Sequence, residues 1–349
     1  MFGGAMTLLN RLLIKDYKSV RGDYFGEISL SYEIFGKPEN LRDRGVLVTH
    51  ALTGNSKVAG TDGWWSHFVA HGGAIDLDRY TVVAFNIPGN GYTTDDTKFH
   101  RHDLLTTKDI ARLFALGLQQ LSIYKLRAAV GGSLGGLITW ELAVEYPEIA
   151  QHFVCIGAPH GSTDWVIGQT MIQEELMKNC RSEAVGVKLS RMMSMLFYRT
   201  PHSFNKRFEQ SWNEEADSYN VESYLRYQAE KLLGRMNPSS YRMMNHLLGS
   251  CDLSVGYDHV ESALERIRGH LLIVGISSDV LFPIETIRES YELLAVLGKT
   301  ATYVSVESRF GHDAFLLPNP PLEEALGEVF PRYRTTENIR FIQEVRSQP

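Results

Sequence analysis

The chain has 349 residues, a length that suits one large α/β domain with an insertion or two separate domains. Its 35 basic and 41 acidic residues give a formal charge of −6 without any basic run, which argues against nucleic acid or an anionic membrane surface as a partner. No apolar stretch approaches the roughly 20 residues that span a bilayer, and the first residues lack the order of a secretory signal. The three cysteines have no metal-site or disulfide-framework spacing. We therefore expect a cytoplasmic protein with no bound metal.

Short β-rich runs alternate along the chain with segments of helical periodicity. This alternation predicts an α/β fold with a doubly wound, mostly parallel sheet. The expected strands are Glu27–Ile34, Val46–Thr49, Tyr80–Phe85, Leu126–Val130, His152–Ile156, Leu271–Gly275 and Ala301–Val306. The expected helices include Lys108–Leu121, Leu137–Glu145, Ile284–Leu297 and Thr336–Arg346.

The alternation stops between residues 160 and 262, which are expected to be helical throughout, with no strand. We therefore predict a core domain made of residues 1–159 and 263–349, and a helical lid domain of residues 160–262. Eight of the ten methionines lie between Met171 and Met244, inside this insertion. Methionine fills irregular apolar space, so these side chains could line a substrate tunnel or fill the lid's own core.

A G-x-S-x-G motif, Gly131 to Gly135, stands between the strand Leu126–Val130 and the helix Leu137–Glu145. This context is typical of a nucleophile elbow, in which a sharp turn lifts the serine hydroxyl clear of the sheet. The following helix N-terminus adds N–H groups and a positive dipole end. The motif predicts Ser133 as the nucleophile; the alternative is a plain glycine-rich connection.

A serine hydroxyl needs a base, and the base needs a carboxylate to orient it. In α/β-hydrolases these residues follow the serine in the order acid, then histidine. Asp279 follows the strand Leu271–Gly275, and His312 follows the strand Ala301–Val306. We therefore predict Ser133, Asp279 and His312 as a catalytic triad at the carboxyl edge of the sheet.

The oxyanion hole of this fold takes one N–H from the residue after the nucleophile and one from the loop after an early central strand. These rules predict the N–H groups of Leu134 and Leu52. His50 precedes Leu52 in the same loop, and we expect it to fix the loop by hydrogen bonding.

Several segments together resemble the homoserine O-acetyltransferase family. The resemblance runs from about residue 30 to residue 318 in matching order. The segments are HALTG (50–54), GWW (63–65), AIDLDRY (74–80), GGSLGG (131–136), VESYLRYQ (221–228) and GHDAFL (311–316). The family has an α/β-hydrolase fold with a helical lid, forms homodimers through that lid, and moves an acyl group from acyl-CoA to an amino-acid hydroxyl. The resemblance implies the same triad.

The resemblance also implies how the amino-acid substrate is held. Arg191 and Tyr198 are seven residues apart, nearly two helical turns, and match the family's substrate-binding pair. Arg191 would hold the α-carboxylate, and Asp313 would hold the ammonium group. The segment Asn86–Asp96 departs from the family's glycine-rich, cysteine-containing pattern, which leaves the acyl donor and the acceptor open.

The leading interpretation is a two-step transfer of acetyl from acetyl-CoA to the hydroxyl of L-homoserine in methionine biosynthesis, with an acyl-serine intermediate. No cofactor is expected, because CoA is a substrate. Succinyl-CoA as donor and serine as acceptor are variants of this interpretation. A carboxylester hydrolase with the same triad and a non-catalytic relative of the fold are the alternatives.

Overall fold

The computed structural model describes residues 9–93 and 102–331. An eight-stranded sheet forms its centre, in the strand order β1-β2-β6-β3-β7-β8-β11-β12. β1 and β2 are antiparallel, β2 meets β6 antiparallel, and all further neighbours are parallel. The strands are β1 (Asn10–Lys18), β2 (Tyr24–Phe35), β3 (Gly45–Thr49), β6 (Thr81–Phe85), β7 (Leu126–Gly132), β8 (Ala150–Ile156), β11 (His270–Ile276) and β12 (Ala301–Val306). The predicted doubly wound sheet is confirmed.

Alternate residues of the central strands enter two different apolar layers. In β3, Leu47 packs into one core cluster while Val46 and Val48 pack into the other. The first cluster is covered by α2 (Thr107–Gln120), α3 (Leu134–Glu145) and α10 (Ile284–Val296). The second is covered by α11 (Pro320–Leu326) and residues 58–77. Coverage on both faces explains why the strand sequences are continuously apolar.

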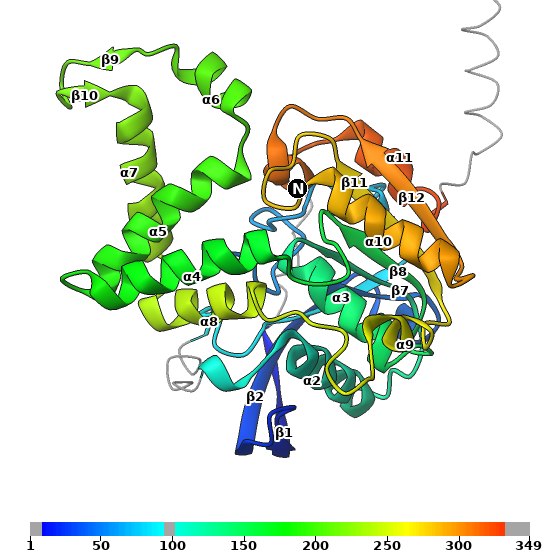
Figure 1. The fold of residues 1–349 in the computed structure, drawn as a ribbon. Coiled ribbons are helices and arrows are strands. Elements are labelled where there is room, and N and C mark those ends of the chain that lie inside the picture. Colours follow the sequence, from blue (N-terminus) through cyan, green and yellow to red (C-terminus); the bar gives the residue numbers. More distant parts are fainter. Residues whose placement is uncertain (1–8, 94–101, 332–349) are drawn as a thin grey trace, which may run out of the picture.

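Most of the remaining elements connect β8 to β11. They are α4 (Asp164–Asn179), α5 (Glu183–Tyr198), α6 (Pro201–Phe208), β9 (Trp212–Asn213), β10 (Ser218–Tyr219), α7 (Asn220–Leu233), α8 (Pro238–Leu248) and α9 (Val260–Leu264). Figure 1 shows α4, α5 and α8 beside the core, and α6, β9 and β10 farther out. The short elements elsewhere are α1 (Leu41–Arg44), β4 (Val69–Ala70), β5 (Ile75–Asp76) and the 3-10 turns Pro38–Asn40, His102–Leu104 and Gly311–Leu316.

Two expectations about the elements need correction. The insertion is not helical throughout, because β9 and β10 form a two-stranded hairpin closed by an edge-to-face contact of Trp212 with Tyr219. Strands of two residues are too short to give a sequence period. The sequence analysis also did not predict β1. Most of its residues are exposed and several are charged, a pattern that is typical of a loop. The expected helix Thr336–Arg346 lies outside the described residues.

The methionines of the insertion serve mainly as packing. Met177, Met236, Met243 and Met244 lie in the first core cluster, which the lid helices share with the sheet. Those four side chains therefore fill a core, as the second alternative expected, but it is one that the lid shares with the sheet and not the lid's own. Within the described parts of the chain, no helix is long and apolar enough to cross a membrane.

Candidate active site

Ser133 sits at the N-terminus of α3, directly after β7. Its backbone has φ 57° and ψ −127°, a conformation that side-chain-bearing residues rarely adopt. Its N–H donates to the carbonyl of Ile156 in the neighbouring strand at 2.9 Å. The sharp turn expected of a nucleophile elbow is therefore present, held by a hydrogen bond to β8.

The glycines of the motif let α3 approach the sheet closely. A Cβ atom on Gly135 would lie 2.1 Å from the carbonyl oxygen of Thr49 in β3. One on Gly131 would lie 2.2 Å from the carbonyl oxygen of Gly135. Thr49 Oγ1 donates to that same Gly135 carbonyl at 2.8 Å. Any side chain at either glycine would separate helix from strand, so the motif's spacing follows from packing.

Asp279 and His312 form a buried hydrogen-bonded pair. The two atoms His312 Nδ1 and Asp279 Oδ2 are 2.6 Å apart. The other carboxylate oxygen accepts the N–H groups of Leu281 and Phe282, both at 2.9 Å. These bonds fix the carboxylate as an acceptor, so His312 carries its proton on Nδ1 and presents Nε2 as the basic atom.

The Nε2 atom of His312 is buried and has no hydrogen-bond partner among the described residues. Aromatic rings surround the imidazole, with centroids 5.6 Å away for Phe282, 5.4 Å for Phe315 and 6.1 Å for Tyr198. His312 and Ser133 line the same cavity. A buried, unpaired base that faces a cavity with a serine can accept a hydroxyl proton there.

The loop after β3 supplies the other predicted donor. Leu52 lines the cavity, whereas Leu134 is the first residue of α3. Within the described chain, neither N–H has a protein acceptor. His50 fixes this loop, since its Nδ1 donates to the Ala51 carbonyl at 2.8 Å and its Nε2 accepts the Ile87 N–H at 3.0 Å. The expected role of His50 is thereby confirmed.

Burial lowers the pKa of His50 to about 4, so its ring is neutral at pH 7. The divergent loop joins the same network. Asn90 Nδ2 donates to Asn86 Oδ1 at 3.1 Å, and Asn86 Oδ1 also accepts the Ser56 N–H at 2.8 Å. Asn86 thus ties the divergent segment to Ser56, just after the loop that carries Leu52, and Asn90 supports Asn86 from within the segment. The last residues of the divergent segment, 94–96, lie outside the described residues.

The cavity has a volume of about 210 Å³ and lies between the core and the lid. Arg191 and Tyr198 reach it from α5, and Asp313 from the turn that carries His312. All the predicted site residues except Asp279 and Leu134 line this one space. Asp279 reaches it through His312, and Leu134 follows the lining residue Ser133 in the chain. Trp64, from the GWW segment, also lines it.

Arg191 has no carboxylate partner among the described residues. Its guanidinium lies 5.4 Å from the Tyr198 ring centroid, and its Nε is buried without an acceptor. A second arginine, Arg235, lines the same cavity, and sequence reasoning missed it because it belongs to no motif. Burial, reinforced by the charge of Arg191, lowers the pKa of Arg235. Two guanidinium groups without acid partners can together receive a carboxylate.

Asp313 is engaged within the protein. Its Oδ2 accepts from Arg199 Nε at 2.7 Å, a contact between the turn of His312 and the lid that the sequence did not indicate. Its other carboxylate oxygen has no partner in the described chain. Asp313 can therefore accept from an ammonium group through Oδ1 while Arg199 holds Oδ2.

Comparison with known proteins gives the family. The α/β-hydrolase fold model matches residues 46–318. The homoserine O-acetyltransferase of Symbiobacterium thermophilum is 33% identical, with 91% of this chain and 92% of the relative covered. The homoserine O-acetyltransferase structure from Bacillus anthracis superposes with a TM-score of 0.84 at 18% identity, covering 95% of this chain and all of that one.

A solved esterase, E22, has nearly the same fold, with a TM-score of 0.82 at 18% identity over 93% of this chain and all of that chain. The backbone fold is thus common to transferases and esterases, while the sequence relationship is specific. On that relationship, the chain belongs to the homoserine O-acetyltransferase family of enzymes with the α/β-hydrolase fold.

Proposed function

We propose that the protein transfers an acetyl group from acetyl-CoA to the side-chain hydroxyl of L-homoserine, in two steps through an acyl-serine, as a step of methionine biosynthesis. The observation that carries the proposal is one cavity holding two kinds of group. Ser133 and His312 supply acyl chemistry, and Arg191 with Arg235 supplies unpaired positive charge. An amino-acid acceptor needs both.

In the first step, His312 Nε2 takes the hydroxyl proton of Ser133 as its oxygen attacks the thioester carbon. Asp279 holds the imidazole in the required tautomer and stabilises the imidazolium that forms. The N–H groups of Leu52 and Leu134 stabilise the oxyanion. The carbon–sulfur bond then breaks, His312 returns the proton to the thiolate, and CoA leaves.

In the second step, homoserine occupies the cavity with its α-carboxylate at Arg191 and its ammonium at Asp313 Oδ1. Tyr198 packs against Arg191 and His312, and so positions both. His312 removes the proton of the homoserine hydroxyl, whose oxygen attacks the acyl-serine carbon. Ser133 leaves and regains its proton from His312. CoA is a substrate throughout, and no resident cofactor or metal enters either step.

Arg235 bears on the choice of substrates. If Arg191 takes the acceptor's carboxylate, Arg235 is a partner for a second carboxylate, such as the one at the end of a succinyl chain. Succinyl-CoA is therefore the alternative donor, and serine the alternative acceptor. Mass spectrometry of the products formed from each donor with each acceptor decides between the four combinations.

A carboxylester hydrolase is the second candidate, favoured by the close likeness to the esterase E22. Water at about 55 M competes with any acceptor, so a transferase must bind its acceptor in position. Homoserine should then accelerate CoA release from acetyl-CoA several-fold under steady-state conditions. An unchanged rate of CoA release with acetate as the product would establish the hydrolase.

We also propose that the protein is a cytoplasmic homodimer joined through the lid of residues 160–262. Several large apolar side chains of the lid are exposed: Trp165, Ile167, Met171, Ile172, Leu189, Leu196, Trp212, Tyr219 and Tyr227. An interface between two copies of the chain would bury such groups. Light scattering at micromolar concentration should give twice the chain mass; a monomer would refute the dimer.

A further inference from the structure

A second pocket adjoins the catalytic cavity on the lid side. It has a volume of about 200 Å³ and is lined from α6, α7 and the segment before His312. Arg199, one of its lining residues, follows Tyr198 of the catalytic cavity, and Phe310, another, stands two residues before His312. Gly311 lies between the two pockets, in close contact with the end of α5. A Cβ atom on Gly311 would lie 3.0 Å from the carbonyl oxygen of Tyr198.

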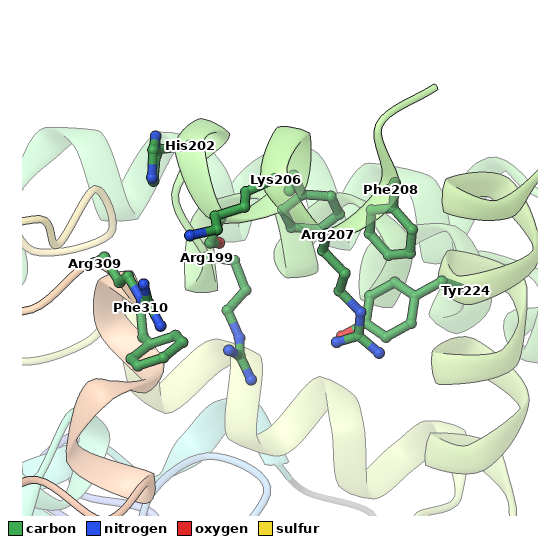
Figure 2. A pocket seen from close by; sticks show the side chains of 10 residues that line it. Arg199, His202, Lys206, Arg207, Phe208, Tyr224, Arg309 and Phe310 are labelled. Carbon is green, nitrogen blue, oxygen red and sulfur yellow. The ribbon is translucent and has the colours of Figure 1, made fainter. Parts of the chain in front are cut away.

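The lining of this pocket is strongly basic. Arg199, Lys206, Arg207 and Arg309 contribute to it, and its lining residues include no aspartate or glutamate. Figure 2 shows these side chains around a common space. In a chain with a net charge of −6, four cations gathered without an acid in the lining form a local positive site.

These cations are poorly neutralised by the protein. Arg199 pairs with Asp313, whereas Lys206, Arg207 and Arg309 have no carboxylate within 4.0 Å in the described chain. Two of these arginines pack on aromatic rings. The Arg207 guanidinium lies 4.5 Å from the Tyr224 ring centroid, and the Arg309 guanidinium lies 5.2 Å from the Phe310 ring centroid. Guanidinium groups positioned in this way bind phosphate oxygens by paired hydrogen bonds, and aromatic faces stack on bases.

The pocket is also anchored to the catalytic turn. Thr200 Oγ1 donates to the Arg309 carbonyl at 2.9 Å and accepts the Ser203 N–H at 3.0 Å, which joins the first turn of α6 to the segment before His312. The first turn of α6 is therefore held next to the segment that leads to His312.

We propose that this basic pocket binds the phosphate-bearing nucleotide end of the acyl donor, with the thioester end at Ser133. The proposal rests on the proposed function, since acyl-CoA is the donor there. CoA carries a diphosphate and a 3′-phosphate at its adenosine end, and a neutral pantetheine arm joins them to the thiol. A donor of this design fits a basic, aromatic pocket that lies beside the cavity containing the nucleophile.

The test is a double variant, Lys206→Ala with Arg207→Ala, both on exposed positions of α6. Its matched control is Arg226→Ala with Lys231→Ala, which removes the same charge from exposed positions of α7. The double variant should raise the KM for acetyl-CoA at least tenfold, with kcat nearly unchanged. The control should keep the wild-type KM.

Acetyl-pantetheine, a donor without the nucleotide, separates phosphate recognition from a damaged lid. Wild type and double variant should use it with equal kcat/KM. The kcat/KM for acetyl-CoA should fall steeply with added salt in the wild type and less in the double variant. Equal kcat/KM values for acetyl-CoA in the double variant and the control would overturn the pocket proposal and leave the proposed function standing.

Calorimetry with adenosine 3′,5′-bisphosphate and with ATP identifies the ligand without turnover. The bisphosphate should bind the wild type and the control, bind the double variant at least tenfold more weakly, and compete with acetyl-CoA. A site that prefers ATP and does not compete with acetyl-CoA would overturn the assignment to the donor. Binding of the bisphosphate by a wild type that turns over no acyl-CoA would support the pocket while refuting the proposed function.

Discussion

The core and the lid contribute side chains to one cavity, but they hold them differently. In the core, each group follows a strand end and is fixed by backbone bonds: Ser133 by Ile156, and Asp279 by two N–H groups. In the lid, Arg191 comes from α5 and Arg235 from the turn between α7 and α8, and neither has an acid partner in the described chain. The core groups thus have hydrogen-bond partners within the protein, whereas the two lid arginines can pair with a carboxylate of a bound ligand.

This difference separates the chemistry from the choice of substrate. The core arrangement of a serine, an imidazole and a carboxylate is what the hydrolysis of an ester also needs. The lid arginines have no use in cleaving a neutral ester. If this division is right, core substitutions should affect both half-reactions, and lid substitutions should affect only one.

The largest effect is expected for the nucleophile. Ser133→Ala should lower both half-reactions by at least about four orders of magnitude, since the residual rate comes from the oxyanion hole and binding alone. The wild type incubated with acetyl-CoA should gain one acetyl group by intact-mass measurement, and the variant none. A mechanism through an acyl-serine should also give parallel double-reciprocal plots of initial rate when both substrates are varied. Intersecting plots with no trapped acetyl-enzyme would exclude that mechanism.

The backbone of Ser133 supplies a control for folding. Its φ of 57° and ψ of −127° suit glycine, and strain of this kind costs about 1–3 kcal/mol. Ser133→Gly should therefore be inactive yet at least as stable as the wild type in urea unfolding. An inactive and unfolded Ser133→Gly would show that the serine is structural.

The lid arginine should split the two half-reactions. Arg191→Ala should lower kcat/KM for homoserine by about 30-fold to 1,000-fold, as expected for loss of about 2–4 kcal/mol from a buried charge contact. CoA release in the absence of acceptor should be nearly unchanged, because the acceptor has not yet bound. Arg226→Ala, an exposed lid arginine, is the control and should alter neither. Equal losses in both half-reactions would make Arg191 a folding residue.

Low pH should lower the free energy of unfolding, because His50 is buried in its neutral form. Its folded-state pKa is about 4, below the ordinary value of 6.5, so the unfolded chain binds its proton first as pH falls. The stability that the neutral ring provides is complete above pH 6.5 and is lost as pH falls toward 4. The loss amounts to about 3 kcal/mol at about 1.4 kcal/mol per pH unit. His152, whose pKa burial also lowers to about 4, adds to the same window.

Urea unfolding at pH 7 and pH 4.5 measures this loss. His50→Gln offers a non-titrating acceptor for the Ile87 N–H and should show a smaller difference between the two pH values. His67→Gln, at an exposed position, should keep the wild-type difference. An undiminished loss in His50→Gln would assign the acid sensitivity to other groups.

The sequence predicted the core far better than the lid, for a physical reason. Continuously apolar strands such as Val46–Thr49 and the elbow around Ser133 follow from burial on both faces and from close packing, which local sequence records. The strand Asn10–Lys18 was not predicted, because an edge strand with exposed charged residues lacks a continuous apolar run. Boundaries of the core helices were predicted to within a few residues.

In the lid, the features that were missed depend on distant contacts. The pairing of Arg199 with Asp313 spans more than 100 residues, and Arg235 reaches the cavity only because α7 packs against α5. No local pattern encodes either arrangement. The family resemblance supplied Arg191 and Tyr198, and the structure brings both to the cavity with His312.

The smallest expected effect tests packing in the two regions. Gly168 lies inside α4, and an added Cβ would meet nothing within 4 Å. Alanine favours a helix interior over glycine by about 0.5–1 kcal/mol, so Gly168→Ala should stabilise the protein by that amount in urea unfolding, with kinetics unchanged. Gly135→Ala is the matched substitution in the core helix. It should instead destabilise the fold and lower activity, because its Cβ would lie 2.1 Å from the Thr49 carbonyl oxygen. If Gly168→Ala is destabilised as well, that face of α4 is covered in solution, and the concentration dependence of the unfolding midpoint will show whether a second copy of the chain covers it.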